Sequence, residues 1–275
     1  MIANLQSHYG FTRMPFTKDV PVSALFSSAA CKEAVARLRW LISARGLGVI
    51  TGEVGAGKTA SLRAAVDALD ASRHALVYLP NPKVGVRGIH GALATALGKA
   101  PCFYTSDLIP QVEAALAAEA DERNRNVILA IDEAHMLTGD QLEAVRMLTS
   151  HDLDSGSPLT VLLIGQPTLR RRLRVSDMAA LDQRVQLKYA FPAPSLTTAE
   201  ADGYIRAHLA HAGRTDTLFS DDAVRAIHAH ARGLPRAINR LATTALLAAC
   251  TENKTIADEK AARTAIAEET ANATD

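Results

Sequence analysis

The fold of this chain is decided by the stretch Gly52-Glu53-Val54-Gly55-Ala56-Gly57-Lys58-Thr59. It follows a short apolar run at residues 47–51 and leads into a helix-like segment that starts at Ala60. A strand, a glycine-rich loop and a helix start, in this order, form the arrangement that cradles the phosphates of a nucleotide. The glycines let successive backbone amides point at phosphate oxygens, and the new helix adds the positive end of its dipole.

The last two residues of this loop have side chains that can bind phosphate and a metal ion. We expect Lys58 to neutralise the β- and γ-phosphates of ATP, and the Thr59 hydroxyl to hold Mg²⁺. A flexible structural loop without a ligand is the alternative interpretation. The residues predicted to bind the nucleotide are Gly52, Glu53, Val54, Gly55, Ala56, Gly57, Lys58, Thr59 and Ala60.

A pair of carboxylates follows a second apolar run. Residues 127–131 are continuously apolar, which favours a strand buried on both faces, and Asp132 and Glu133 come directly after it. In a doubly wound sheet, ligands bind beyond the carboxyl ends of the strands. We therefore expect Asp132 to hold Mg²⁺ through water, and Glu133 to polarise the water that attacks the γ-phosphate. Alternatively, the pair only caps the next helix.

The remaining pattern changes character along the chain. Apolar runs at residues 75–79, 159–164 and 186–190, separated by helical patterns such as 107–120, predict a parallel α/β sheet. The segment Phe191-Pro192-Ala193-Pro194-Ser195 predicts a hinge. Thr197-Thr198-Ala199-Glu200 is a capping-box sequence, and only helices are predicted beyond it, at residues 198–212, 220–231, 235–249 and 258–267. The sequence thus predicts an α/β nucleotide-binding domain, residues 1–192, followed by a small helical domain, residues 193–275.

Composition limits the classes of partner. The 275 residues are 48% hydrophobic with a net charge of +1, so a sizeable core is expected and any nucleic-acid surface must be local. Cys31, Cys102 and Cys250 are far apart and odd in number, which indicates buried thiols in a reducing compartment rather than disulfides or a metal site. The sequence shows no basic-then-apolar leader and no apolar stretch of membrane-spanning length. We therefore expect a cytoplasmic protein without a membrane partner of its own.

Taken together, the motifs resemble those of the AAA+ ATPases of the ExeA type. That family includes secretion ATPases and the ATP-dependent target-selection subunits of transposons. The resemblance runs over nearly the whole chain. It is carried by the opening Tyr9-Gly10-Phe11-Thr12-Arg13-Met14-Pro15-Phe16, the phosphate loop, Asp132-Glu133, Leu163-Ile164-Gly165-Gln166-Pro167, Gln183-Arg184 and Gly233-Leu234-Pro235-Arg236-Ala237-Ile238-Asn239.

The resemblance implies further site residues. Gln166 occupies the sensor 1 position, where the family usually has Asn, Thr or Ser, and Arg236 matches the sensor 2 arginine of the lid. Arg184 matches the arginine finger that completes the site of a neighbouring subunit, so the resemblance implies a homo-oligomer. A surface salt bridge is the alternative for Arg184. Nearby arginines that could serve instead are Arg170, Arg171, Arg172 and Arg174.

The N-terminal segment has two interpretations. By the same resemblance, residues 1–45 contribute to the adenine pocket and Phe16 lines it. Alternatively, Phe16 is a plain core residue.

The resemblance does not decide on which molecule the ATPase acts. Secretion ATPases of this family typically continue into a membrane anchor and a cell-wall-binding domain, which 275 residues do not include, so we expect a regulator of transposition. Such a protein would form a ring or helical filament on duplex DNA and recruit a transposase. The DNA contacts would come from Lys83, Arg87 and Lys99, a few cations repeated along a filament. The alternatives are an assembly ATPase of a secretion or envelope system and a nucleotide-gated signalling switch.

Overall fold

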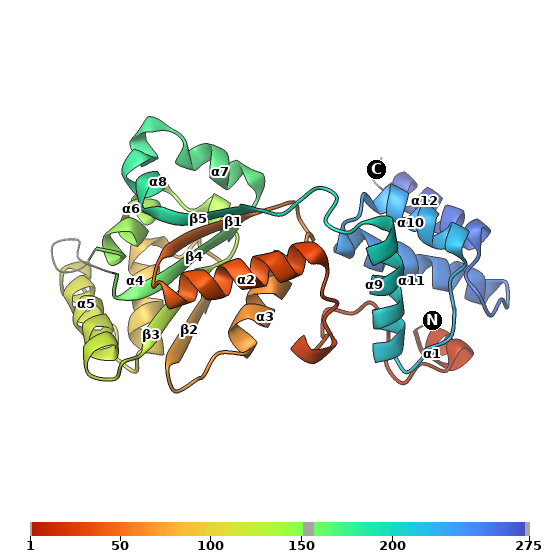
Figure 1. Ribbon diagram of the computed structural model, residues 1–275, viewed down its shortest axis with the longest axis horizontal. Helices are drawn as coiled ribbons and strands as arrows, with labels where there is room; N and C mark the ends of the chain where they lie inside the picture. The colour runs from red at the N-terminus through yellow and green to blue at the C-terminus, as the bar shows by residue number, and fades with distance from the viewer. Residues whose placement is uncertain (1, 151–156, 273–275) are drawn as a thin grey trace. The chain divides into compact units, whose positions relative to one another are not determined.

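The computed structural model describes residues 2–150 and 157–272, which form two compact units (Figure 1). The sheet unit comprises residues 33–52 and 61–191, and the helical unit comprises residues 1–32, 53–60 and 192–275. The boundary after residue 191 lies next to the predicted hinge. The N-terminal segment and the phosphate loop group with the C-terminal helices, and the predicted division into residues 1–192 and 193–275 stays a prediction.

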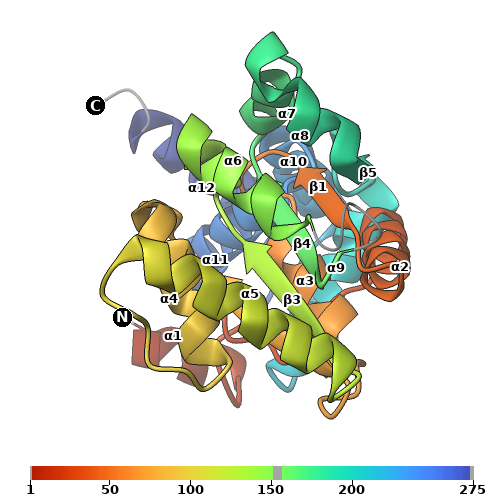
Figure 2. The ribbon, with the colours of Figure 1, turned by 90° about the vertical axis from the view of Figure 1, so that its left-hand side faces the viewer.

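The sheet unit contains a five-stranded parallel sheet in the order β2-β3-β4-β1-β5 (Figures 1 and 2). This confirms the predicted parallel α/β sheet. The three inner strands are buried along their length, whereas the edge strands β2 and β5 alternate between buried and exposed residues. The strands are β1 (Leu47–Thr51), β2 (His74–Leu79), β3 (Asn126–Ile131), β4 (Leu159–Gly165) and β5 (Val185–Ala190).

Helices of this unit pack against the sheet through buried apolar residues. The helix predicted at residues 107–120 is α5, and its predicted apolar face, Leu108, Val112, Ala115 and Leu116, is buried. The helix α6 begins with a capping box between Thr138 and Gln141. The helices are α2 (Ala29–Ser43), α3 (Lys58–Asp67), α4 (Gly85–Ala96), α5 (Thr105–Asp121), α6 (Gly139–Leu148), α7 (Pro167–Leu173) and α8 (Ala179–Arg184).

The helical unit forms around a second core. The predicted capping box is present, because the Thr197 amide donates to Glu200 Oε2 at 2.9 Å and the Glu200 amide donates to Thr197 Oγ1 at 3.3 Å. All four predicted helices exist, with ends shifted by a few residues. Together with the N-terminal helix they are α1 (Ile2–Tyr9), α9 (Thr198–His211), α10 (Asp221–Ala231), α11 (Pro235–Thr251) and α12 (Glu259–Asn272). Of the last five residues, 273–275 lie outside the described part of the chain.

The N-terminal segment is part of this second core. Leu5, Tyr9, Phe11 and Phe16 are buried in it, and the Tyr9 hydroxyl donates to the Leu246 carbonyl at 3.2 Å. The Phe16 ring lies 5.3 Å from the ring of His208 and 6.3 Å from that of Phe219. This packing accounts for Phe16 as a core residue, so a contact with adenine stays a prediction. No helix among residues 2–150 and 157–272 has both the length and the hydropathy needed to cross a membrane.

Candidate active site

The sheet brings the predicted motifs to one edge. β4 lies between β1 and β3, and the register pairs Thr51 with Gly165 and Leu163 with Ile131. The Gly52 amide donates to the Gly165 carbonyl at 3.2 Å, one residue before Gln166. The start of the phosphate loop, Asp132 and Gln166 therefore leave three adjacent strands at their carboxyl ends, where a doubly wound sheet binds its ligands.

The phosphate loop has the backbone that its glycines predict. Gly55 has a φ of +83° and Gly57 a φ of +101°, in the region that other residues rarely adopt. The Lys58 ammonium donates to the Glu53 carbonyl at 2.8 Å, and α3 starts at Lys58. A Cβ built at Gly57 would meet no described atom within 4 Å. A loop with left-handed glycines, an open side and a helix N-terminus fits the phosphates of ATP.

Arg236 lies directly against this loop. A Cβ built at Gly55 would lie only 2.5 Å from Arg236 Cβ. Arg236 is the second residue of α11, after Pro235 in the first position, so the rigid start of a helix sets where it stands. The sequence placed these residues 181 positions apart (236 minus 55), and the fold brings them into contact. The predicted sensor 2 role of Arg236 stays a prediction.

Asp132 is buried, and hydrogen bonds hold both its backbone amide and its carboxylate. Its amide donates to the Leu79 carbonyl at 2.9 Å, its Oδ1 accepts from the Glu133 amide at 2.8 Å, and its Oδ2 accepts from the Tyr78 hydroxyl at 2.8 Å. Burial, followed by the hydrogen bond to Asp132, raises the pKa of Tyr78, so the phenol remains a donor at neutral pH. Carboxylate and hydroxyl oxygens, as on Asp132 and Thr59, are the donors that Mg²⁺ prefers.

Glu133 has a different environment from its neighbour. Its backbone is left-handed, with a φ of +50°, and its side chain is 50% exposed. The side chain makes no cap to the following turn, so capping does not explain this residue. Glu133 Oε2 lies 3.3 Å from Nδ1 of His135, whose carbonyl accepts from Arg172 at 2.7 Å. A strained, half-exposed carboxylate beside a fixed, buried one is an arrangement often found at functional sites.

Sequence reasoning missed Tyr78 and His135. Tyr78 lies one residue before the end of β2 and pairs with Ala130 of β3, so its ring can reach the residue that follows β3. The available signal was a polar-tipped residue at the end of an otherwise apolar run, but its use required knowledge of strand order. His135 was visible only as a neighbour of Glu133.

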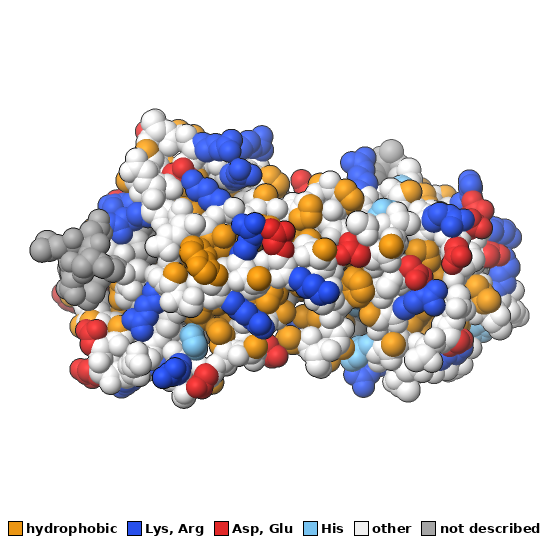
Figure 3. Space-filling view, in the orientation of Figure 1, with side chains coloured by type: hydrophobic (Ala, Val, Ile, Leu, Met, Phe, Trp, Pro, Cys, Tyr) orange, Lys and Arg blue, Asp and Glu red, His pale blue; other side chains and the backbone are white. Residues whose placement is uncertain are grey.

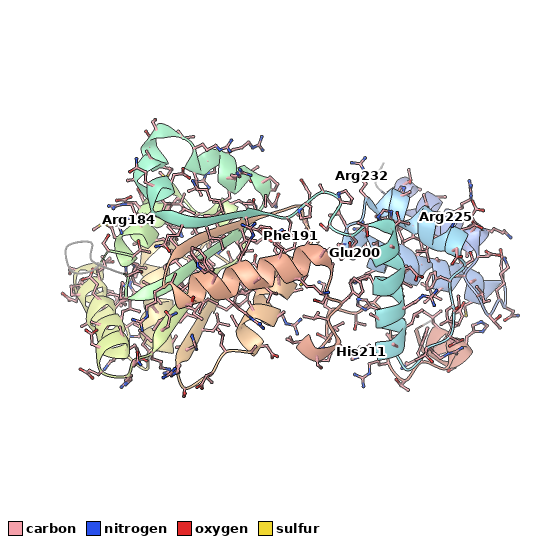
Figure 4. All side chains as sticks on the ribbon, in the orientation of Figure 1. Arg184, Phe191, Glu200, His211, Arg225 and Arg232 are labelled. Carbon is pink, nitrogen blue, oxygen red and sulfur yellow. The ribbon has the colours of Figure 1, made fainter. Side chains whose placement is uncertain are left out.

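Arg184 is engaged within its own chain. It is the last residue of α8, and its Nη1 lies 3.3 Å from the Thr149 carbonyl oxygen and 3.4 Å from Thr149 Oγ1 (Figure 4). The alternative candidates on and after α7 differ among themselves, since Arg172 is half-buried while Arg170, Arg171 and Arg174 are exposed. Figure 3 shows Lys and Arg side chains gathered over this part of the sheet unit.

The three predicted DNA contacts are all exposed, but they are not equivalent. Arg87 donates from Nε to the Phe103 carbonyl at 3.1 Å and from Nη2 to the Cys102 carbonyl at 3.3 Å. It therefore fastens the loop before α5. Lys83 and Lys99 lie on either side of α4, and a DNA contact by any of the three stays a prediction.

Known proteins resemble this chain in sequence and in fold. A family model described as "AAA domain" matches residues 41–173. The chain is 31% identical over 247 residues to General secretion pathway protein A of Aeromonas hydrophila, covering 88% of this chain and 44% of that protein. The chain thus spans less than half the length of this relative.

Two solved structures show the same fold. The ORC2 protein of Aeropyrum pernix, as ADPNP and ADP complexes, has a TM-score of 0.68 at 15% identity, over 92% of this chain and 71% of that one. Cdc6p of Pyrobaculum aerophilum has a TM-score of 0.66 at 16% identity, over 88% and 66%. Residues 41–173 of this chain therefore match an AAA domain, and the chain has the fold of the P-loop NTPases.

Proposed function

We propose that this protein is an ATPase that uses ATP with Mg²⁺, and that the two carboxylates after β3 have separate roles in hydrolysis. Asp132, which is buried and has hydrogen bonds at its amide and at both carboxylate oxygens, holds the Mg²⁺ ion together with Thr59. Glu133, half-exposed and free of a capping role, takes the proton of the attacking water. The contrast between these two adjacent environments is the observation that carries the proposal.

The other residues bind and orient. The loop amides and Lys58 hold the β- and γ-phosphates, and the bound Mg²⁺ supplies neutralisation of their charge. Gln166, at the end of the strand between β1 and β3, orients the attacking water. Arg236, in contact with the loop at Gly55, responds to the terminal phosphate.

Arg184 acts on the nucleotide of a neighbouring subunit, so full activity requires a homo-oligomer, a ring or a helical filament. In its own chain the guanidinium rests against Thr149.

Variants at Lys58 and Glu133 test the catalytic assignment. Lys58→Ala should remove ATP binding, and Glu133→Gln should keep ATP bound while turnover stops. ATP affinity by calorimetry and phosphate release are the measurements. Wild-type turnover in Glu133→Gln would assign the water to another group.

The similarity to General secretion pathway protein A favours one candidate for the process that ATP hydrolysis by this protein would drive. In this candidate function the chain is an ExeA-like assembly ATPase of a secretion or envelope system. It would work from the cytoplasm through a membrane-bound partner protein.

The second candidate is a DNA-binding regulator of transposition that selects target DNA and recruits a transposase. It is favoured by exposed cations, Arg170, Arg171 and Arg174 around α7 and Lys83 and Lys99 around α4. Cations repeated along an oligomer bind phosphates without a strongly basic monomer.

One experiment separates the two candidates. The protein is examined by electron microscopy with duplex DNA and a non-hydrolysable ATP analogue, with Lys58→Ala as the control. Filaments or rings on DNA that need nucleotide and dissolve with added salt support the transposition role. No association with DNA under any nucleotide condition excludes it and leaves the assembly role. An adjacent transposase gene or secretion operon gives the same discrimination.

A further inference from the structure

We propose that Tyr78 is a positioning residue for ATP hydrolysis, because its hydroxyl fixes the Asp132 carboxylate in the orientation that receives Mg²⁺. The inference rests on the proposed metal-binding role of Asp132. It assigns a function to a residue of the edge strand that the phosphate-loop motifs do not include.

The geometry leaves the carboxylate little freedom. Asp132 Oδ1 accepts from the Glu133 amide and Oδ2 from the Tyr78 hydroxyl, each at 2.8 Å. Two donors on the two oxygens define the plane of the group. The backbones of both residues are fixed as well, because Tyr78 pairs with Ala130 in the sheet and the Asp132 amide donates to the Leu79 carbonyl.

The chemistry of the donor suits a metal ligand. A lysine or arginine in this place would neutralise the carboxylate and oppose the binding of a cation. A phenol donates a hydrogen bond without adding a positive charge, so the bond from Tyr78 does not neutralise Asp132. Tyr78 thus orients the ligand and leaves it able to bind metal.

The ring itself has a small structural role. Tyr78 is 41% exposed on the edge strand, so its packing contributes less than that of a core residue. Removing the hydroxyl leaves the ring in place and takes one hydrogen bond away from Oδ2 of an aspartate that is 9% exposed. The main consequence is then a mobile carboxylate rather than an unfolded protein.

The test is Tyr78→Phe, with Tyr104→Phe as matched control. Tyr104 is 67% exposed in the same unit and undergoes the same chemical change. Two quantities are measured: the Mg²⁺ concentration that gives the half-maximal hydrolysis rate, and the equilibrium affinity for an ATP analogue with and without Mg²⁺. Unfolding midpoints by circular dichroism check that both variants fold.

We expect Tyr78→Phe to raise the half-saturating Mg²⁺ concentration about tenfold, the size of one lost hydrogen bond to a charged group. Affinity for the metal-free nucleotide should not change, and saturating Mg²⁺ should restore most of kcat. Tyr104→Phe should behave as wild type. An unchanged Mg²⁺ dependence in Tyr78→Phe would overturn the inference.

Asp132→Asn separates this inference from the proposed function beneath it. If Asp132→Asn loses Mg²⁺-dependent binding while Tyr78→Phe keeps it, only the role of Tyr78 is wrong. If Asp132→Asn itself binds Mg²⁺-nucleotide as wild type does, the metal-binding role of Asp132 is wrong and the inference goes with it.

Discussion

Replacing Gly55 by alanine should destabilise the protein through two separate effects. The first is backbone strain, because a φ of +83° costs an alanine about 1–2 kcal/mol. The second is a steric clash, since the new Cβ would lie 2.5 Å from Arg236 Cβ. That atom is attached to the backbone of α11, so relief requires a shift of the helix start, which adds about 1–3 kcal/mol.

Gly57→Ala is the matched control for this prediction. Its φ of +101° imposes similar strain, but its Cβ would meet no described atom within 4 Å. Urea unfolding followed by circular dichroism should therefore show Gly55→Ala less stable than Gly57→Ala by about 1 kcal/mol or more. ATP affinity should fall in Gly57→Ala, because its Cβ occupies the open side of the loop.

A double variant locates the clash. Arg236→Gly removes the facing Cβ, so adding Gly55→Ala to it should cost only the strain of about 1–2 kcal/mol. Equal destabilisation by Gly55→Ala and Gly57→Ala in the wild-type background would refute the contact between the loop and α11.

Three further predictions concern catalysis and pH. Arg184→Ala should bind ATP normally and should not hydrolyse it, with turnover measured at high protein concentration. Unimpaired turnover in this variant would mean that another arginine is the arginine finger. His135→Ala, which removes the ring next to Glu133 Oε2, should change kcat more than the KM for ATP in steady-state assays; an equal change in both would indicate a binding role. Burial, and then His211, lowers the pKa of His208 from 6.5 to about 4. The unfolded chain therefore binds the proton first, and stability that is complete above pH 6.5 falls towards pH 4, by about 2 kcal/mol near pH 5. A pH series of urea unfolding should show this loss in the wild type and not in His208→Leu, and parallel profiles would contradict it.

Much of the fold was predictable because its signals are local. Residues 127–131 are a continuous apolar run, and the structure shows β3 buried at every position. The capping sequence at Thr197 and Glu200 predicted the start of α9 from side chains three residues apart. The conformation of the phosphate loop is also a local property, because its glycines adopt a left-handed backbone that other residues tolerate poorly.

The rest depended on contacts between segments far apart in the chain. The bond from Tyr78 to Asp132 requires β2 to lie beside β3, which chain order alone does not state. The bonds from the Arg87 guanidinium to two carbonyls before α5 also join separate segments, and its DNA contact stays a prediction. The predicted roles of Gln166, Arg184 and Arg236 concern a nucleotide and a neighbouring subunit, so they stay predictions.

The burial of N-terminal aromatic side chains among the C-terminal helices affects how this protein can be dissected. Leu5, Tyr9, Phe11 and Phe16 fill the core that α9 to α12 surround. A fragment cut at the hinge, residues 192–275, would expose the apolar surface that these four side chains cover. We expect such a fragment to self-associate in solution. Supplying residues 1–32 as a separate peptide should restore a soluble heterodimer, because the two pieces share a single hydrophobic interior.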